Sequence, residues 1–230
     1  MVSGFALTAV ILVFTIAATA DLTSVQRIDL GFATTLFALG FVGCLLCAFS
    51  FASLSGEVSS VATLTDSMLV GSGLLVCIVA VLGGFEALAA AFLPDSSVVF
   101  LVICTAMAAV APTFVWFPHW DILQRYGPPT YSGPPQDDAE AGRLLVKVSA
   151  LGWAAAAGGL VVQRSGLFGE SQHWEYLTLS FIGLAYTSAM VLLGLWVSTW
   201  RHRARLSTRI TWLLASIQSI TIFALIALLP

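Results

Sequence analysis

The chain consists of long apolar runs separated by short polar stretches. Seven runs can hold a membrane-crossing helix, and they cover residues 2–20, 30–54, 68–93, 98–117, 144–162, 176–200 and 210–229. Each is close to or above the about 20 residues that cross a hydrocarbon core as a helix. The runs are continuously apolar and lack the period-two alternation of a barrel strand. The pattern therefore predicts an all-α, polytopic integral membrane bundle of seven transmembrane helices.

The first run has a second interpretation, which would leave six helices. Ala18-Thr19-Ala20 has the small-x-small form of a signal-peptidase site. A signal peptide, however, normally begins with positively charged residues, and the segment from Met1 to Phe5 carries none. We expect a retained helix, with a cleaved signal as the alternative.

The composition sets the class of protein. Of the 230 residues, 59% are hydrophobic and 9% are charged, whereas a soluble domain has about 45–50% apolar and about 25% charged residues. The formal net charge is −3, and the chain has no basic stripe that would neutralise the phosphates of a nucleic acid. We therefore expect residues 1–230 to form a single transmembrane domain whose main partner is the lipid bilayer, and we expect no nucleic-acid binding.

Lysine and arginine are distributed unevenly between the two sides of the predicted bundle. The side that holds the N-terminus carries, on or next to it, Arg125, Arg143, Lys147, Arg201, Arg203, Arg205 and Arg209. The other side carries only Arg27 and Arg164. Because cytoplasmic loops are enriched in Lys and Arg, the sequence predicts a cytoplasmic N-terminus and an external C-terminus in the cell membrane.

The longest polar stretch, residues 118–143, is expected to be a Pro-rich cytoplasmic loop. It contains two Gly-Pro-Pro copies, followed by Asp137, Asp138 and Glu140. Proline removes a backbone donor and favours an extended or polyproline conformation. The acidic residues favour the start of the next helix, because they complement the positive end of its dipole.

Glu86 is a carboxyl group inside the apolar run 68–93. At about 1.5 Å per residue from Leu93, it lies about 10 Å inside the outer end of the helix. A carboxylate at that depth is costly unless it is protonated, paired or facing water. The sequence therefore predicts a site for a cation, a proton or a charged ligand, with Thr34 and Thr35 at similar depth as hydrogen-bond partners. The alternative is a glutamate that reaches the headgroups or is protonated in a helix contact.

A second polar cluster lies near the middle of the last two runs. Its members are Tyr186, Thr187, Ser188, Ser216, Gln218, Ser219 and Thr221. Side chains of this kind commonly bond across helices in membranes. Alternatively they line a pore or pocket, in which case Tyr186 and Gln218 would face the ligand.

Small residues and cysteines indicate close helix packing. Glycine or alanine is frequent in the runs 30–54, 68–93 and 144–162, where it allows helix backbones to approach or to form a homo- or hetero-oligomer. Cys44 and Cys47 have CxxC spacing, but the chain has no loop cysteine that could relay electrons to them. We expect the cysteines to pack as apolar side chains.

The chain has few residues for catalysis or for metal and cofactor binding. His119, His173 and His202 lie outside the predicted helices, HExxH is absent, and the last run has no lysine for a retinal Schiff base. We therefore expect no metal, no cofactor and no catalytic residue, which argues against an enzyme.

Two functions follow. The first is a small transporter or channel-like bundle that moves an ion or small solute, with Glu86 at an outer entry near Asp21, Asp29 and Asp95 and with Tyr186 and Gln218 lining the middle. The second is a non-catalytic accessory or assembly subunit of a membrane protein complex, with contacts through its small-residue faces and Pro-rich loop.

Overall fold

The computed structural model is all α-helical. It describes residues 2–19, 21–54, 61–126, 138–165, 182–183, 185–193 and 208–228. The helices with defined bounds are α1 (Val2–Thr19), α2 (Ser24–Leu54), α3 (Val61–Phe92), α4 (Pro94–Tyr126), α5 (Asp138–Ser165) and α7 (Thr208–Ala227). Residues 182–183 and 185–193 are also helical and precede α7 in the chain. The predicted fold class is thereby confirmed as all-α.

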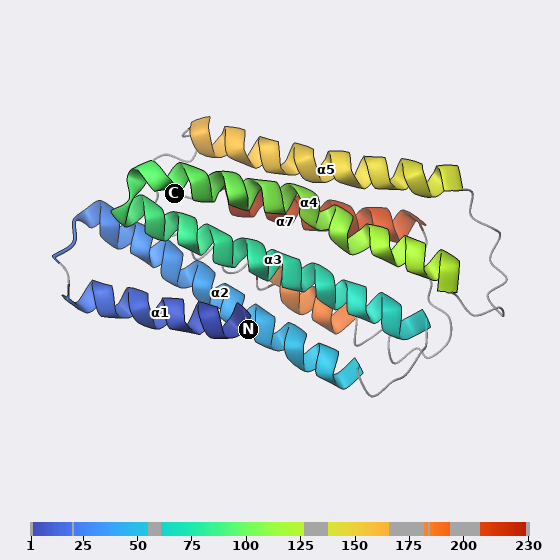
Figure 1. The fold of residues 1–230 in the computed structure, drawn as a ribbon, viewed down its shortest axis with the longest axis horizontal. Coiled ribbons are helices and arrows are strands. Elements are labelled where there is room, and N and C mark those ends of the chain that lie inside the picture. Colours follow the sequence, from blue (N-terminus) through green and yellow to red (C-terminus); the bar gives the residue numbers. More distant parts are fainter. Residues whose placement is uncertain are drawn as a thin grey trace.

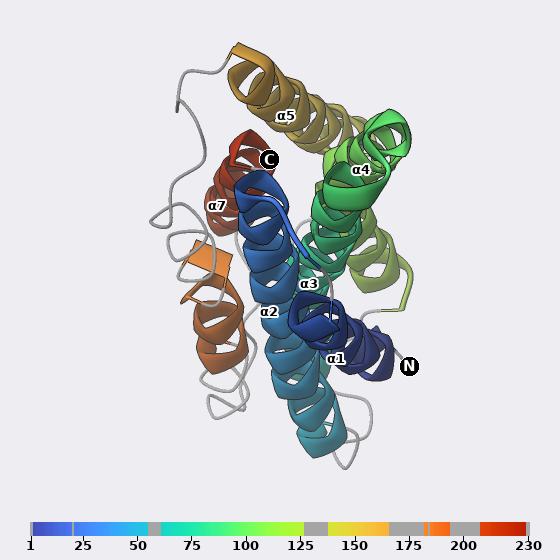
Figure 2. The same ribbon diagram turned by 90° about the vertical axis from the view of Figure 1, so that its left-hand side faces the viewer.

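The helices form an elongated bundle in which successive elements run in opposite directions (Figure 1). Helices α2 and α3 pack against each other in the middle, with α1 on α2 and α4 on α3. Helix α5 packs against α4 and α7, and α7 also contacts α3 and α4. The view along the bundle shows the helical residues before α7 beside α2, on the side away from α4 (Figure 2). One end of the bundle therefore gathers the start of α2, the end of α3, the start of α4 and the end of α5.

Four helices of the described residues are long and apolar enough to cross a membrane. Their candidate spans are Ser24–Ser50, Leu69–Phe92, Asp95–Pro112 and Val146–Ser165. Ala6–Thr19 and Trp212–Ala227 are shorter apolar helices. By helix length and hydropathy the chain is a multi-pass membrane protein. Large apolar side chains such as Ile11, Phe14 and Phe49 are exposed on its surface, as expected for a surface in contact with lipid.

Helix α2 begins six residues earlier than the predicted run 30–54. Thr23 and Gln26 form a capping box in which the Gln26 backbone N–H donates to Thr23 Oγ1 at 3.3 Å and the Thr23 N–H donates to Gln26 Oε1 at 3.0 Å. These two hydrogen bonds provide acceptors for backbone N–H groups that would otherwise lack a partner at the start of the helix. The predicted run began at Leu30, and the cap extends the helix to the polar residues before it.

The stretch predicted as a loop over 118–143 is partly helical. Helix α4 continues to Tyr126 and α5 begins at Asp138, so His119 lies in a helix and not in a loop. Pro118 removes one backbone hydrogen bond, a loss that a helix can absorb as a local kink. Asp138 and Glu140 fall in the first turn of α5. The Gly-Pro-Pro copies, in residues 127–137, lie outside the described residues.

The α3–α4 connection is very short, because only Leu93 separates the two helices. Pro94 occupies the first position of α4, where its missing N–H costs nothing, and Asp95 lies in the first turn. The Ser96 N–H donates to the Leu93 carbonyl at 2.8 Å. This tight turn holds the end of α3 beside the start of α4.

Several glycines allow the close helix contacts that the sequence predicts. A Cβ at Gly152 of α5 would collide with the Ala109 carbonyl of α4, and one at Gly40 of α2 would collide with Val81 of α3. A Cβ at Gly71 of α3 would meet nothing within 4 Å. The close approach is therefore specific to particular glycines.

The four cysteines are buried and free, as expected for packing residues. Cys77 of α3 lies within interaction range of Cys44 and Cys47 of α2. These three thiols therefore belong to the α2–α3 contact, whereas Cys104 of α4 donates to the Val79 carbonyl of α3 at 3.6 Å.

Candidate functional site

Glu86 is the most enclosed acidic side chain of the described residues. It lies on α3, the central helix of the bundle, and only 2% of its surface is exposed. Its Oε2 atom is buried and has no hydrogen-bond partner among the described residues. A buried carboxylate without a partner is costly in an apolar medium unless it is protonated, paired or facing water.

Asp29 provides a second buried carboxyl group near Glu86. It lies on α2 with 8% of its surface exposed. Glu86 lies six residues before Phe92 and Asp29 five residues after Ser24, the ends of their candidate spans, which at 1.5 Å per residue places both about 8–9 Å inside the same end of the bundle. The charge of Asp29 acts on Glu86, and so does the opposite charge of Arg164 on α5. Glu86 thus lies within electrostatic range of a second acid on α2 and of a cation on α5.

Apolar side chains occupy the same level of the bundle. The ring centroids of Phe37 and Phe85 are 5.0 Å apart in an edge-to-face contact, and those of Phe85 and Phe100 are 6.4 Å apart in a stacked one. Cys104 of α4 is buried and lies within electrostatic range of Glu86. In such surroundings electrostatic interactions between the carboxyl groups are weakly screened.

The part of the chain that the structure describes holds no group of three or more His, Cys, Asp or Glu side chains suited to a metal ion. Asp29 and Glu86 are two acids only, so they fit a proton or a small cation that keeps some other ligands. Two carboxyl groups supply too few ligands for a dedicated metal cage.

Thr34 does not make the hydrogen bond to Glu86 that its depth suggested. Its hydroxyl donates to the Leu30 carbonyl of its own helix at 2.8 Å, and its side chain lines a cavity between α1 and α2. A hydroxyl has one proton to donate, so this bond excludes donation to Glu86. Thr35 is half-buried on α2, and its role as a partner of Glu86 stays a prediction.

Tyr186 uses its hydroxyl in a contact between helices. The hydroxyl donates to Ser72 Oγ of α3 at 3.1 Å, and Thr187 Oγ1 lies 3.5 Å from Cys77 Sγ. These bonds tie the helical residues 185–193 to α3, which matches the interpretation of helix-to-helix bonding for Tyr186 and Thr187. Gln218 is fully buried on α7. A shared ligand site for Tyr186 and Gln218 stays a prediction.

Asp29 is the member of the site that the pattern of apolar runs misplaced. That pattern assigned it to a polar stretch before the helix, near the outer entry. The capping box at Thr23 and Gln26 is the sequence signal that would have placed Asp29 inside α2. Its proximity to Glu86 depends on the packing of α2 against α3.

Comparison with known proteins supplies no family for the chain. No family model, no curated protein and no solved structure matches it.

Proposed function

We propose that the protein is a small transporter or channel-like bundle that moves a proton or a small cation, with Glu86 as the binding group. The observation that carries this proposal is the buried Oε2 of Glu86, which has no partner among the described residues. Ionisable residues inside membranes are rare and usually mark an ion pathway or a proton relay. Asp29 supports the assignment as a second buried acid on the neighbouring helix.

Two carboxyl groups that interact in an apolar setting disfavour the doubly charged state. Binding a proton or a cation between them removes that repulsion, and loss of the bound ion restores it. Asp21 and Asp95 are exposed at the same end of the bundle, together with Arg27 and Arg164. In this proposal ions enter at this end, because it is the end nearer to Asp29 and Glu86.

The proposal includes seven membrane crossings in the cell membrane, with the N-terminus in the cytoplasm and the C-terminus outside. The alternating helix directions support it (Figure 1), and so does the bias of Lys and Arg toward the N-terminal side. In this orientation the Glu86 end of the bundle faces outward.

A flux assay on the purified full chain in liposomes tests the proposal. Dyes inside the liposomes would report the entry of H⁺, Na⁺ and K⁺ under an imposed gradient of each ion. We expect the wild type to move at least one of these ions above protein-free liposomes. Glu86→Gln, which keeps the shape and removes the ionisable group, should reduce that flux to background, and Glu86→Asp should restore part of it.

The matched control is Asp66→Asn on the same helix. Asp66 lies twenty residues before Glu86, which is about 30 Å along α3, so this variant should keep the wild-type flux. Wild-type liposomes without flux of any of the three ions would refute the proposal. Equal flux in the wild type and Glu86→Gln would remove Glu86 from it.

The second candidate, an accessory subunit of a membrane complex, is favoured by the surface of α1. Among the described helices α1 packs mainly against α2, and Leu7, Ile11, Leu12 and Phe14 are exposed. Such an apolar face fits either lipid or a partner helix. A subunit should copurify with a larger partner and lose stability without it, whereas a transporter should be stable alone and should melt at a higher temperature when its ion is added.

A further inference from the structure

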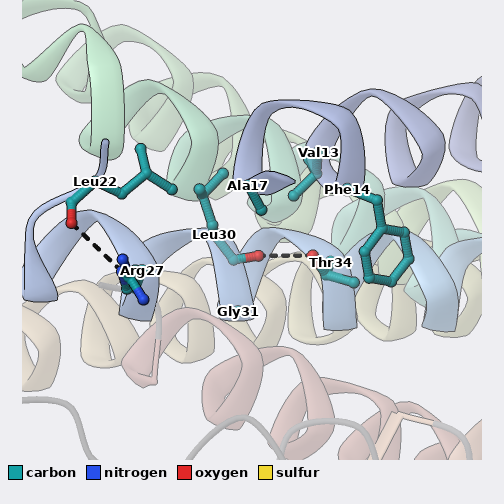
Figure 3. Close-up of a pocket in the computed structure, with 8 residues that line it drawn as sticks. All are labelled: Val13, Phe14, Ala17, Leu22, Arg27, Leu30, Gly31 and Thr34. Atoms are coloured by element: carbon teal, nitrogen blue, oxygen red, sulfur yellow. Dashed lines mark hydrogen bonds between the residues drawn. The ribbon is translucent and has the colours of Figure 1, made fainter. Parts of the chain in front are cut away.

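A groove between α1 and α2 is separate from the Glu86 site. Its volume is about 250 Å³, and Val13, Phe14 and Ala17 of α1 face Leu30 and Thr34 of α2 across it (Figure 3). The lining is mostly apolar, with Arg27 at one end. A pocket that binds a small molecule usually has a volume of about 300–1,000 Å³ and encloses most of its ligand. This groove is smaller and suits part of a longer molecule.

Arg27 is the charged group of the groove. Its side chain is exposed, and its Nε donates to the Leu22 carbonyl at 3.3 Å, which holds the guanidinium at the groove's end (Figure 3). No ion pair of Arg27 with another described residue is present. Asp29, two residues along α2, is buried near Glu86, and side chains two positions apart do not share a helix face.

The position of Arg27 in α2 also favours an anion. It lies in the first turn of a helix that begins at Ser24, where the helix dipole is equivalent to about half a positive charge. The positive end of the dipole repels the guanidinium of Arg27. A bound anion would be attracted by the dipole and by the guanidinium. A guanidinium group binds phosphate oxygens in a planar, two-pronged geometry.

The depth of the groove residues matches a molecule with a charged head and an apolar tail. Arg27 lies three residues inside the candidate span that starts at Ser24, so it is at the boundary of the membrane. Thr34 lies seven residues further along α2, about 10 Å deeper. The small side chains of Ala17 and Gly31 keep this deeper part open.

We propose that the groove binds one anionic phospholipid of the leaflet at the Glu86 end, with its phosphate at Arg27 and part of one acyl chain between α1 and α2. The apolar lining below Arg27 provides the reason for a lipid as the occupant, because a free phosphate would leave that surface uncovered. The remainder of the lipid lies in the surrounding bilayer. This binding is independent of ion movement through Glu86.

Thermal unfolding of the full chain in detergent tests the proposal. Intact-mass measurement would first check that the chain has its full length. A maleimide dye that reacts with the four buried cysteines would report unfolding. Phosphatidylglycerol should raise the melting temperature in a concentration-dependent and saturable manner. Phosphatidylcholine, which has no net charge, should raise it less, and inorganic phosphate should leave it unchanged.

Two variants address the head and the tail of the lipid separately. Arg27→Gln should weaken the affinity for phosphatidylglycerol about tenfold to hundredfold, the usual effect of losing a charged hydrogen bond. Ala17→Leu should weaken it by filling the groove while keeping the arginine. Lys147→Gln removes an exposed cation that lies toward the opposite end of the bundle and should retain the wild-type affinity.

Three results would overturn the proposal. They are equal stabilisation by the two lipids, stabilisation by inorganic phosphate alone, and undiminished affinity in both Arg27→Gln and Ala17→Leu. If Arg27→Gln does not fold, Ala17→Leu and the lipid comparison on the wild type still decide the outcome.

Discussion

The contact between α4 and α5 depends on a glycine whose replacement has a calculable effect. In Gly152→Ala the new methyl group would collide with the backbone carbonyl of Ala109 and lie 3.3 Å from Pro112 Cγ. A backbone carbonyl in a helix cannot move away as a side-chain tip can. The two helices must therefore separate, which loosens the packing around Ala109 and Ala156, both fully buried.

Gly71→Ala is the matched control for this change, because a Cβ at Gly71 meets no atom within 4 Å. Both substitutions gain the same helix propensity, so the difference between them isolates the collision. Overpacking of this kind costs about 1–3 kcal/mol. In a protein of this size, that corresponds to a melting temperature about 2–12 °C below that of Gly71→Ala.

The thiol-reactive dye assay measures this difference directly, because unfolding exposes the buried cysteines. Detergent, protein concentration and heating rate must be the same for both variants. If Gly152→Ala melts at or above the temperature of Gly71→Ala, then α5 does not approach α4 at Gly152 and the packing described for this pair of helices is wrong.

The remaining predictions concern a buried hydrogen bond and the orientation of the bundle. Tyr186→Phe should destabilise the protein by about 0.6–1.7 kcal/mol, the range for bonds between membrane helices, and adding Ser72→Ala should cost little more because the bond is already lost. Additive losses in the double variant would show that the two side chains do not interact. In intact cells, a membrane-impermeant maleimide should label Asp95→Cys and should label Ala139→Cys only after permeabilisation, because the two positions lie at opposite ends of the bundle. The reverse pattern would invert the proposed orientation.

The apolar runs were sufficient to predict the all-α class and the approximate place of each described helix. A bilayer core requires long segments with satisfied backbone groups, and this requirement appears directly in the order of residues. Helix ends were predicted less well. The run boundaries followed hydropathy, whereas the true start of α2 depends on the capping box at Thr23 and Gln26, and α4 continues past Pro118.

One part of the candidate site was predicted from the sequence, and the other part was found only in the structure. A single carboxyl residue within an apolar run is easily recognised, so Glu86 was identified from the sequence alone. Only the packing of α2 on α3 brought Asp29 near it. The packing of α1 on α2 formed the groove that Thr34 lines, and the packing of residues 185–193 on α3 joined Tyr186 to Ser72. Local propensity and hydropathy depend on neighbours along the chain, whereas the partner of a buried polar group depends on which helix faces meet. That choice is made by side-chain fit between helices, as at Gly40 and Gly152, and it appears only in the tertiary structure.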